Sequence, residues 1–165
     1  MSREIDKAKT TSSFEDFFEA EYDRIMRAMY LASGQLDLAE ELTQETMARA
    51  YERWDRIRKL DSPAGYVMKI AFNLRHSWFR RAARVLVSPR LEPGDASPPA
   101  DLRDEIEDML HSLPSEQRDA LVLVEWLGLS SEEAGSVLGI SPASVRGRIH
   151  RARTSLRNRL GEDDD

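Results

Sequence analysis

The chain has 165 residues, of which 41% are hydrophobic and 33% are charged, so it is long enough for one ordinary domain or two small ones. Its net charge of −6, taken as an average, argues against a protein that binds nucleic acid. The absence of cysteine excludes disulfide bonds, thiolate metal sites and cysteine nucleophiles. A polar N-terminal segment and the lack of a long apolar run predict a cytoplasmic protein without membrane insertion.

The charges are distributed unevenly along the chain. Residues 62–91 and 134–161 each carry six basic side chains and no acidic one, while residues 92–133 carry a net charge of −10. Like charges cluster where a surface meets phosphate, although a charge run is more often only a solvated face. The average therefore conceals two candidate phosphate-binding segments.

A proline-rich segment, SPRLEPGDASPPA at residues 88–100, predicts a linker rather than a helix or strand. We therefore expect two small domains, at residues 13–87 and 101–161, between a flexible tail at 1–12 and an acidic tail at 162–165. Apolar residues recur with helical spacing on both sides of the linker, and no segment shows strict apolar–polar alternation. The sequence predicts an all-α fold.

The first domain is predicted to begin with two amphipathic helices. Apolar residues from Phe14 to Tyr30 recur every three or four positions and form one stripe. The next helix has an apolar side with Ala39, Leu42, Thr46 and Ala50. Its opposite side is an acidic and amide face containing Glu40, Glu41, Gln44 and Glu45. Such a face usually does nothing but keep a protein soluble.

A third helix is predicted from Pro63 to about Arg84, because a serine hydroxyl at position 62 can cap free amides and proline is tolerated at the first helical position. Basic and aromatic side chains alternate along it, so it is a candidate surface for unpaired bases and their backbone. The opposing interpretation is a plain core helix, since Trp78 and one of the phenylalanines are more often buried than functional. The predicted buried stripe consists of Val67, Ile70, Ala71, Leu74 and Trp78.

The second domain is predicted to begin with an acidic helix and to end with a helix-turn-helix. Ser130 and Glu133 have capping-box spacing, Gly139 can end the first short helix, and Ser141 before Pro142 begins the second. Such a second helix can enter a major groove. Its outward face has no acidic neighbour in the sequence and consists of Ser141, Ser144, Arg146, Arg148, Arg151 and Arg153. The alternative is a basic helix that pairs with the acidic stretch at 101–108.

Three motifs occur together in an order and spacing that resemble the extracytoplasmic-function (ECF) sigma factors of bacterial RNA polymerase. They are AEELTQETMARAYERW at 39–54, SPAGYVMKIAFNLRHSWFRR at 62–81, and the segment from LPSEQRD to LRNRL at 113–160. The resemblance implies a non-enzymatic factor, without cofactor or metal, that binds core polymerase and directs it to promoters. Many relatives have an anti-sigma factor, which makes such a protein a candidate partner.

The resemblance also implies a role for each motif. In the family, the acidic-amide helix docks on the clamp helices of the largest polymerase subunit. The loop before residue 62 and the following helix hold the opened minus-ten element, and the last helix reads the minus-thirty-five duplex. The polymerase flap is a further contact that the resemblance implies. The implied residues are Glu41, Gln44, Glu45 and Arg49 for the polymerase; Arg58, Lys59, Asn73, Arg75, His76 and Arg80 for the minus-ten strand; and Ser141, Ser144, Arg146, Arg148, Arg151 and Arg153 for the minus-thirty-five duplex.

Two consequences follow from the resemblance and the charge pattern. Ala134 and Gly135 stand where many relatives have a bulky aliphatic residue and alanine, and a helix-internal glycine costs about 1 kcal/mol relative to alanine, so we expect a weakened turn motif. The acidic blocks are expected to suppress DNA binding by the free protein until polymerase separates the domains.

Two other classes of function fit the sequence less well. A helix-turn-helix regulator with a sensing or dimerising first domain would bind paired half-sites, but it would not need the polymerase-docking face. An enzyme is poorly supported, because the three histidines are scattered and there is neither a glycine-rich phosphate loop nor a nucleophile motif.

Overall fold

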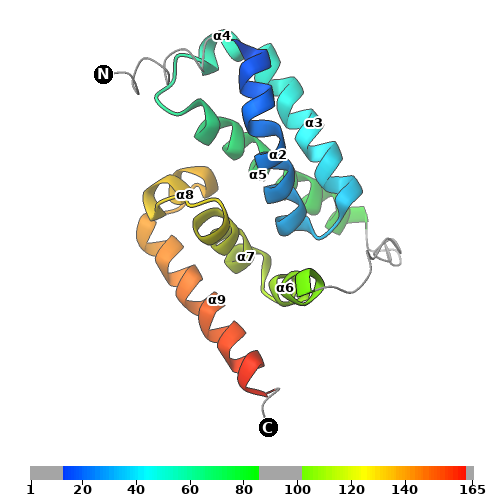
Figure 1. Cartoon of the computed structure of the whole chain (residues 1–165), viewed down its shortest axis with the longest axis vertical. Helices are drawn as coiled ribbons and strands as arrows, with labels where there is room; N and C mark the ends of the chain where they lie inside the picture. Colours follow the sequence, from blue (N-terminus) through cyan, green and yellow to red (C-terminus); the bar gives the residue numbers. More distant parts are fainter. Residues whose placement is uncertain (1–12, 86–101, 163–165) are drawn as a thin grey trace.

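The computed structural model describes residues 13–85 and 102–162, and the predicted all-α class is confirmed because these residues contain helices and no strand. In the first half, two long helices run antiparallel and a third packs against both (Figure 1). The helices of this half are α2 (Phe14–Ser33), α3 (Leu36–Glu52), the short α4 (Trp54–Ile57) and α5 (Pro63–Val85).

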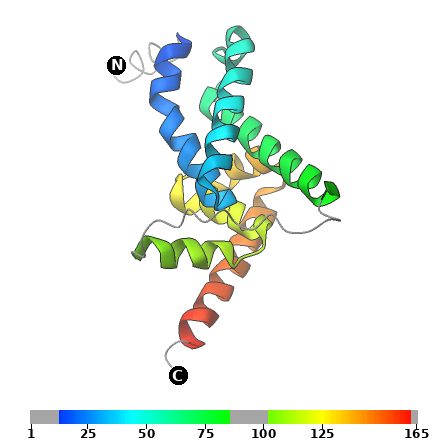
Figure 2. The same cartoon turned by 90° about the vertical axis from the view of Figure 1, so that its right-hand side faces the viewer.

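The second half consists of shorter helices followed by one long one. Its last helix extends away from the rest of the molecule (Figure 2). The elements are α6 (Leu102–His111), α7 (Ser115–Leu121), the π-helix η1 (Val122–Trp126), α8 (Ser131–Leu138) and α9 (Pro142–Glu162). The predicted linker at 88–100 and both predicted tails, apart from Glu162, lie outside the described residues. No helix in the described part of the chain combines the length and apolarity needed to cross a bilayer.

The local signals at the helix ends have the predicted geometry. The Ser62 hydroxyl accepts a hydrogen bond from the Gly65 amide at 3.1 Å. Ser130 and Glu133 form the reciprocal capping box, and the hydrogen bonds from Ser130 lower the pKa of the Glu133 carboxyl. Gly139 ends α8 with φ +70°, the left-handed conformation that glycine adopts without a steric penalty.

The expectation that Gly135 weakens the turn motif is wrong, because this position has no room for a side chain. Gly135 is buried, and a Cβ atom there would lie 2.6 Å from the carbonyl oxygen of Ile140. The Ile140 amide in turn donates to the Gly135 carbonyl at 3.0 Å. The glycine therefore permits α8 to approach the backbone of the turn that leads into α9.

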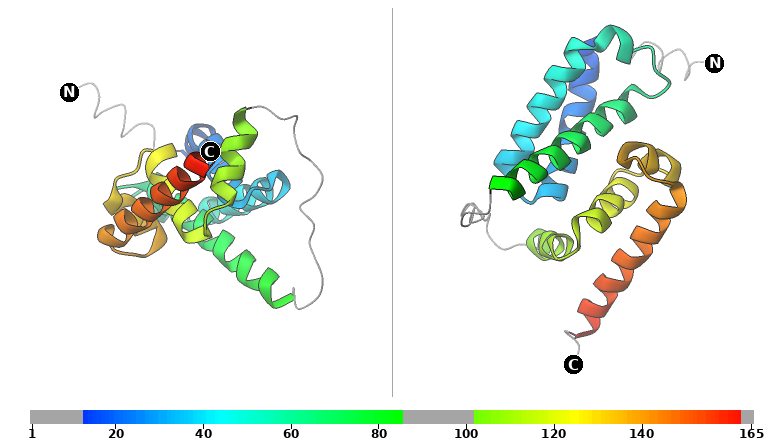
Figure 3. Two further views of the ribbon diagram at one scale, coloured as in Figure 1. Left: turned by 90° about the horizontal axis from the view of Figure 1, so that it is seen from below. Right: turned by 180° about the vertical axis from the view of Figure 1, so that it is seen from behind.

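The two halves pack against each other and share one hydrophobic cluster of buried residues. In the right-hand view of Figure 3, α5 lies between the α2–α3 pair and the second half. Polar contacts add to this packing: Arg24 donates to the Leu127 carbonyl at 3.0 Å, and the Tyr30 hydroxyl donates to Glu107 at 2.7 Å.

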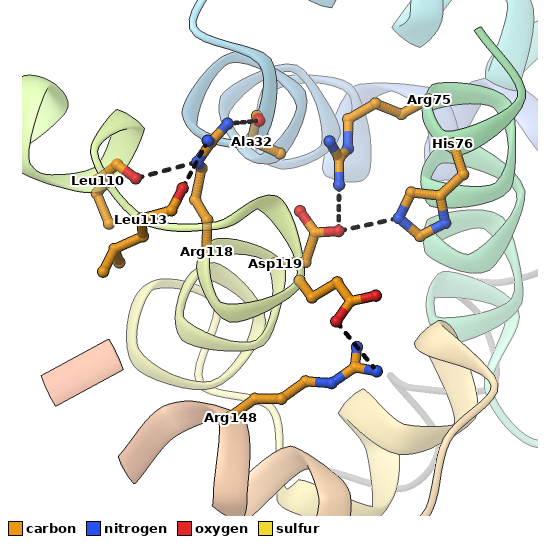
Figure 4. Close-up of polar contacts among 9 residues, drawn as sticks. Ala32, Arg75, His76, Leu110, Leu113, Arg118, Asp119 and Arg148 are labelled. Carbon is orange, nitrogen blue, oxygen red and sulfur yellow. Dashed lines mark hydrogen bonds and ion pairs between the residues drawn. The ribbon is translucent and has the colours of Figure 1, made fainter. Parts of the chain in front are cut away.

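Arg118 on α7 joins the ends of two helices across this interface. Its guanidinium donates to the carbonyls of Ala32 at 2.8 Å, Leu110 at 3.0 Å and Leu113 at 3.0 Å (Figure 4). Carbonyls at helix C-termini lack partners within their own helix and carry partial negative charge, so a cation is favourable there. Burial nevertheless lowers the pKa of Arg118, and the nearby charge of Arg75 adds to that effect.

The imidazole of His111 lies against Gly34 at the end of α2, where a Cβ atom would be 2.6 Å from Nε2. Burial, followed by the charge of Arg118, lowers the pKa of His111 from its ordinary value of 6.5, while Glu107 and Asp108 oppose that shift. The folded protein therefore favours the neutral ring.

Acidification through about pH 6.5 is expected to reduce the melting temperature by way of this histidine. Because the folded-state pKa is depressed, the unfolded chain binds the proton more readily. The stabilisation is therefore complete above the unfolded pKa and decreases as the pH falls towards the folded pKa. Thermal unfolding followed by circular dichroism should show a shallower pH dependence for His111→Gln than for the wild type. Equal slopes would contradict this expectation.

Candidate nucleic-acid interfaces

The start of α9 is held by two serines. The Ser141 hydroxyl accepts from the Ser144 amide at 3.1 Å, and the two hydroxyls lie 2.9 Å apart. Both residues are exposed, as predicted for the tip of a helix that enters a groove. Val145 and Ile149 are buried on the opposite side and anchor α9 to the second half.

The four predicted arginines of α9 fall into two groups. Arg146 and Arg151 are exposed, whereas Arg148 lies 3.9 Å from Glu116 of α7 and Arg153 pairs with Glu125 of η1. The sequence contains no acidic residue from 134 to 161, but in the folded protein acidic side chains from α7 and η1 lie next to two of these arginines. These acids also differ from those of the alternative interpretation, which paired the helix with residues 101–108.

A basic groove of about 450 Å³ lies between α3 and α5. Of the predicted minus-ten residues only Asn73 lines it, and Arg49, predicted for the polymerase, lines it as well. The sequence placed Tyr66, Lys69 and Arg81 in the alternation of basic and aromatic residues along α5, but it missed Arg53, because neighbouring positions on different segments create the groove. No acidic side chain is among the residues that line it, which are Arg49, Arg53, Tyr66, Lys69, Ile70, Asn73, Leu74, Ser77 and Arg81.

Two of the predicted minus-ten residues, Arg75 and His76, contact the second half of the structure instead. Arg75 is 1% exposed and its guanidinium donates to the carboxylate of Asp119 on α7. His76 Nε2 lies 2.9 Å from the same Asp119 oxygen (Figure 4). The structure therefore engages these two residues with Asp119, whereas Asn73 and Arg80 are exposed. The sequence around Arg75 gives no sign of Asp119, which lies 44 positions away.

The remaining predicted minus-ten residues lie before α5 and are exposed. Arg58 is 3.6 Å from Asp55, and Lys59 follows it in the turn after α4. Neither residue lines the basic groove.

All four predicted polymerase-docking residues are exposed on one side of α3. Gln44 donates to Glu40 at 3.4 Å, and Arg49 donates to Glu45 at 2.9 Å, so two pairs one turn apart stabilise this face. An aromatic groove of about 380 Å³ adjoins it at Gln44. Sequence reasoning missed this groove, which is lined by Phe14, Phe18, Tyr22, Gln44, Met47, Ala48 and Tyr51.

The matches to known families follow the two halves of the structure. The family model for Sigma-70 region 2 matches residues 17–85, and that for Sigma-70 region 4 matches residues 103–156. The RNA polymerase sigma-E factor of Streptomyces coelicolor is 32% identical over 89% of this chain and 85% of its own length. The ECF RNA polymerase sigma factor SigE of Mycolicibacterium smegmatis is 34% identical over 91% of this chain, which spans 62% of that relative.

The chain belongs to the ECF sigma factors. This sigma factor therefore acts with RNA polymerase in promoter-directed initiation of transcription. Its fold is similar to that of the sigma factor RpoE of Bartonella quintana, solved in complex with the anti-sigma factor NepR, with a TM-score of 0.76. The identity is 24%, and the match covers 90% of this chain and 96% of that one.

Proposed function

We propose that this sigma factor uses three separate surfaces during initiation. The face of α3 with Glu41, Gln44, Glu45 and Arg49 docks on the polymerase clamp helices. The basic groove and the exposed side of α5 hold the minus-ten strand. The exposed side of α9 reads the minus-thirty-five duplex, with the second domain (101–161) also meeting the flap. An anti-sigma factor remains a predicted partner.

The basic groove is the observation that carries this proposal. Four cations line it, namely Arg49 of α3, Arg53 of the turn after α3, and Lys69 and Arg81 of α5; Asn73 and Tyr66 lie beside them, and no acid is in its lining. Cations that follow a backbone beside an aromatic ring are the chemistry of single-strand binding. Phosphate contacts position the strand, and an exposed amide such as Asn73 can hydrogen-bond a base edge.

Transcription from a template library with randomised promoter sequences tests the function directly. Core polymerase with the sigma factor should produce transcripts whose upstream sequences share two spaced elements, and core polymerase alone should not. Sequencing of the transcript 5′ ends provides the measurement. The same transcripts with and without the sigma factor would contradict the proposal.

Replacement of the docking face tests the polymerase contact separately. The double variant Gln44→Ala with Glu45→Ala is expected to weaken the affinity for core polymerase by about tenfold or more, because a few interface residues carry most of the binding energy. Asp23→Ala removes an exposed acid from α2 and serves as the matched control. A fluorescence titration with core polymerase measures both, and equal affinities would show that α3 does not dock there.

A further inference from the structure

One side of α5 packs against the second half, although Phe79 near its end remains exposed. Met68, Phe72, Arg75 and Phe79 recur at spacings of three and four, which places them along one side of the helix. Met68 lines a cavity together with Leu129 and Val137 of the second half. Arg75 is among the largest fully buried side chains of the described residues, and its guanidinium lies 5.6 Å from the ring centre of Phe72 and 5.4 Å from that of Phe79.

Asp119 binds this side of α5 from α7. It is 2% exposed, and one of its oxygens receives both the Arg75 guanidinium and Nε2 of His76. The other oxygen, Oδ1, and the Nε atom of Arg75 are buried without a hydrogen-bond partner among the described residues. The contact is therefore charged, buried and incompletely hydrogen-bonded.

Such a pair holds two surfaces in one arrangement without stabilising them strongly. Desolvation of the two charges offsets much of their attraction, and each unpartnered polar atom adds a further cost. Removal of one partner alone is far more harmful, because it leaves an unpaired charge buried. The interface is thus specific, and a competitor that offers Arg75 a better partner can open it.

A nucleic-acid phosphate is such a competitor. Arginine binds phosphate with two parallel hydrogen bonds, whereas here it reaches a single carboxylate oxygen. Arg75 and His76 also belong to the same helix as Asn73, Lys69 and Arg81 of the basic groove. His76 stands three positions after Asn73 and keeps 41% of its side chain exposed, so a strand held at Asn73 comes within reach of the Asp119 contact.

We propose that Arg75, His76 and Asp119 form an interdomain latch, in which α5 holds either Asp119 or a DNA phosphate but not both. Closure of the two halves and capture of the strand then oppose each other, and by linkage each weakens the other equally. The predicted competition with DNA rests on the proposed function of α5, whereas the contact that holds the two halves closed does not.

Measurement of the distance between the two halves in the free protein tests whether the Asp119 contact holds them closed. The chain has no cysteine, so Glu19→Cys on α2 and Asn158→Cys on α9, both at exposed positions, accept a fluorescent donor and acceptor specifically. Asp119→Asn is expected to lengthen the interdomain distance and to raise the affinity for a single-stranded DNA oligonucleotide by about tenfold. Glu105→Gln removes the same charge from an exposed position of α6 and should change neither quantity. A folded Asp119→Asn variant that behaves like Glu105→Gln would overturn the latch.

Titration of the labelled protein with the same oligonucleotide provides a test that needs no change at the latch. Binding should lengthen the interdomain distance, whereas binding at an unchanged distance would overturn the proposal even where Asp119→Asn fails to fold. The transcription assay with the randomised promoter library tests the proposed function separately from the latch. A wild type that does not direct initiation contradicts the proposed function, while the effect of Asp119→Asn on distance still decides the latch.

Discussion

Gly135→Val is expected to lower the melting temperature by about 10 °C, because the site has no space for a side chain. A Cβ atom would lie 2.6 Å from a backbone oxygen, that of Ile140, which cannot move aside as a flexible side chain could. Movement of that carbonyl would also disturb the hydrogen bond from the Ile140 amide to Gly135. The energetic cost is about 3 kcal/mol, the upper end of what overpacking typically costs.

Ser136→Val is the matched control for this change. It introduces the same β-branched residue into the same helix, but at the adjacent exposed position. Its melting temperature should fall by no more than about 2 °C, in keeping with an exposed helical site. Circular dichroism measures both variants, and similar melting temperatures would show that the turn adapts to a side chain at position 135.

Arg151→Ala is expected to weaken binding of the holoenzyme to a promoter duplex by about tenfold to a hundredfold. Arg151 is exposed on α9 and has no ion pair within the described part of the chain, so its guanidinium is free to bind a base edge or a phosphate. Loss of a base contact would also relax sequence preference at one position of the minus-thirty-five element.

Arg153→Ala provides the comparison, because it removes the same group from the same helix. Arg153 pairs with Glu125, so its guanidinium is already engaged within the second half. We expect a smaller loss for this variant, of about threefold or less, because Arg153 would have to leave Glu125 before it could bind DNA. Competition binding at several salt concentrations measures both, and equal losses would place Arg153 on the DNA surface alongside Arg151.

The sequence was sufficient for features that depend on neighbours within about four positions. Helical periodicity identified the buried side of α3 and the exposure of Glu41, Gln44 and Glu45, since one turn of helix determines which side chains share a face. The Ser130–Glu133 capping box and the left-handed Gly139 followed from the local backbone chemistry of helix ends. The family was also recognisable, because its motifs consist of such local patterns.

Only the tertiary structure decided which charged groups meet. Arg75 reads as a basic residue on an amphipathic helix, yet it is buried against Asp119, which lies 44 positions later. Glu125 lies 28 positions before Arg153, and the basic groove likewise required α3 and α5 to be placed side by side. Helical spacing determines the face on which a charge lies, but the packing of one helix against another determines whether that face meets water, a counter-ion or DNA.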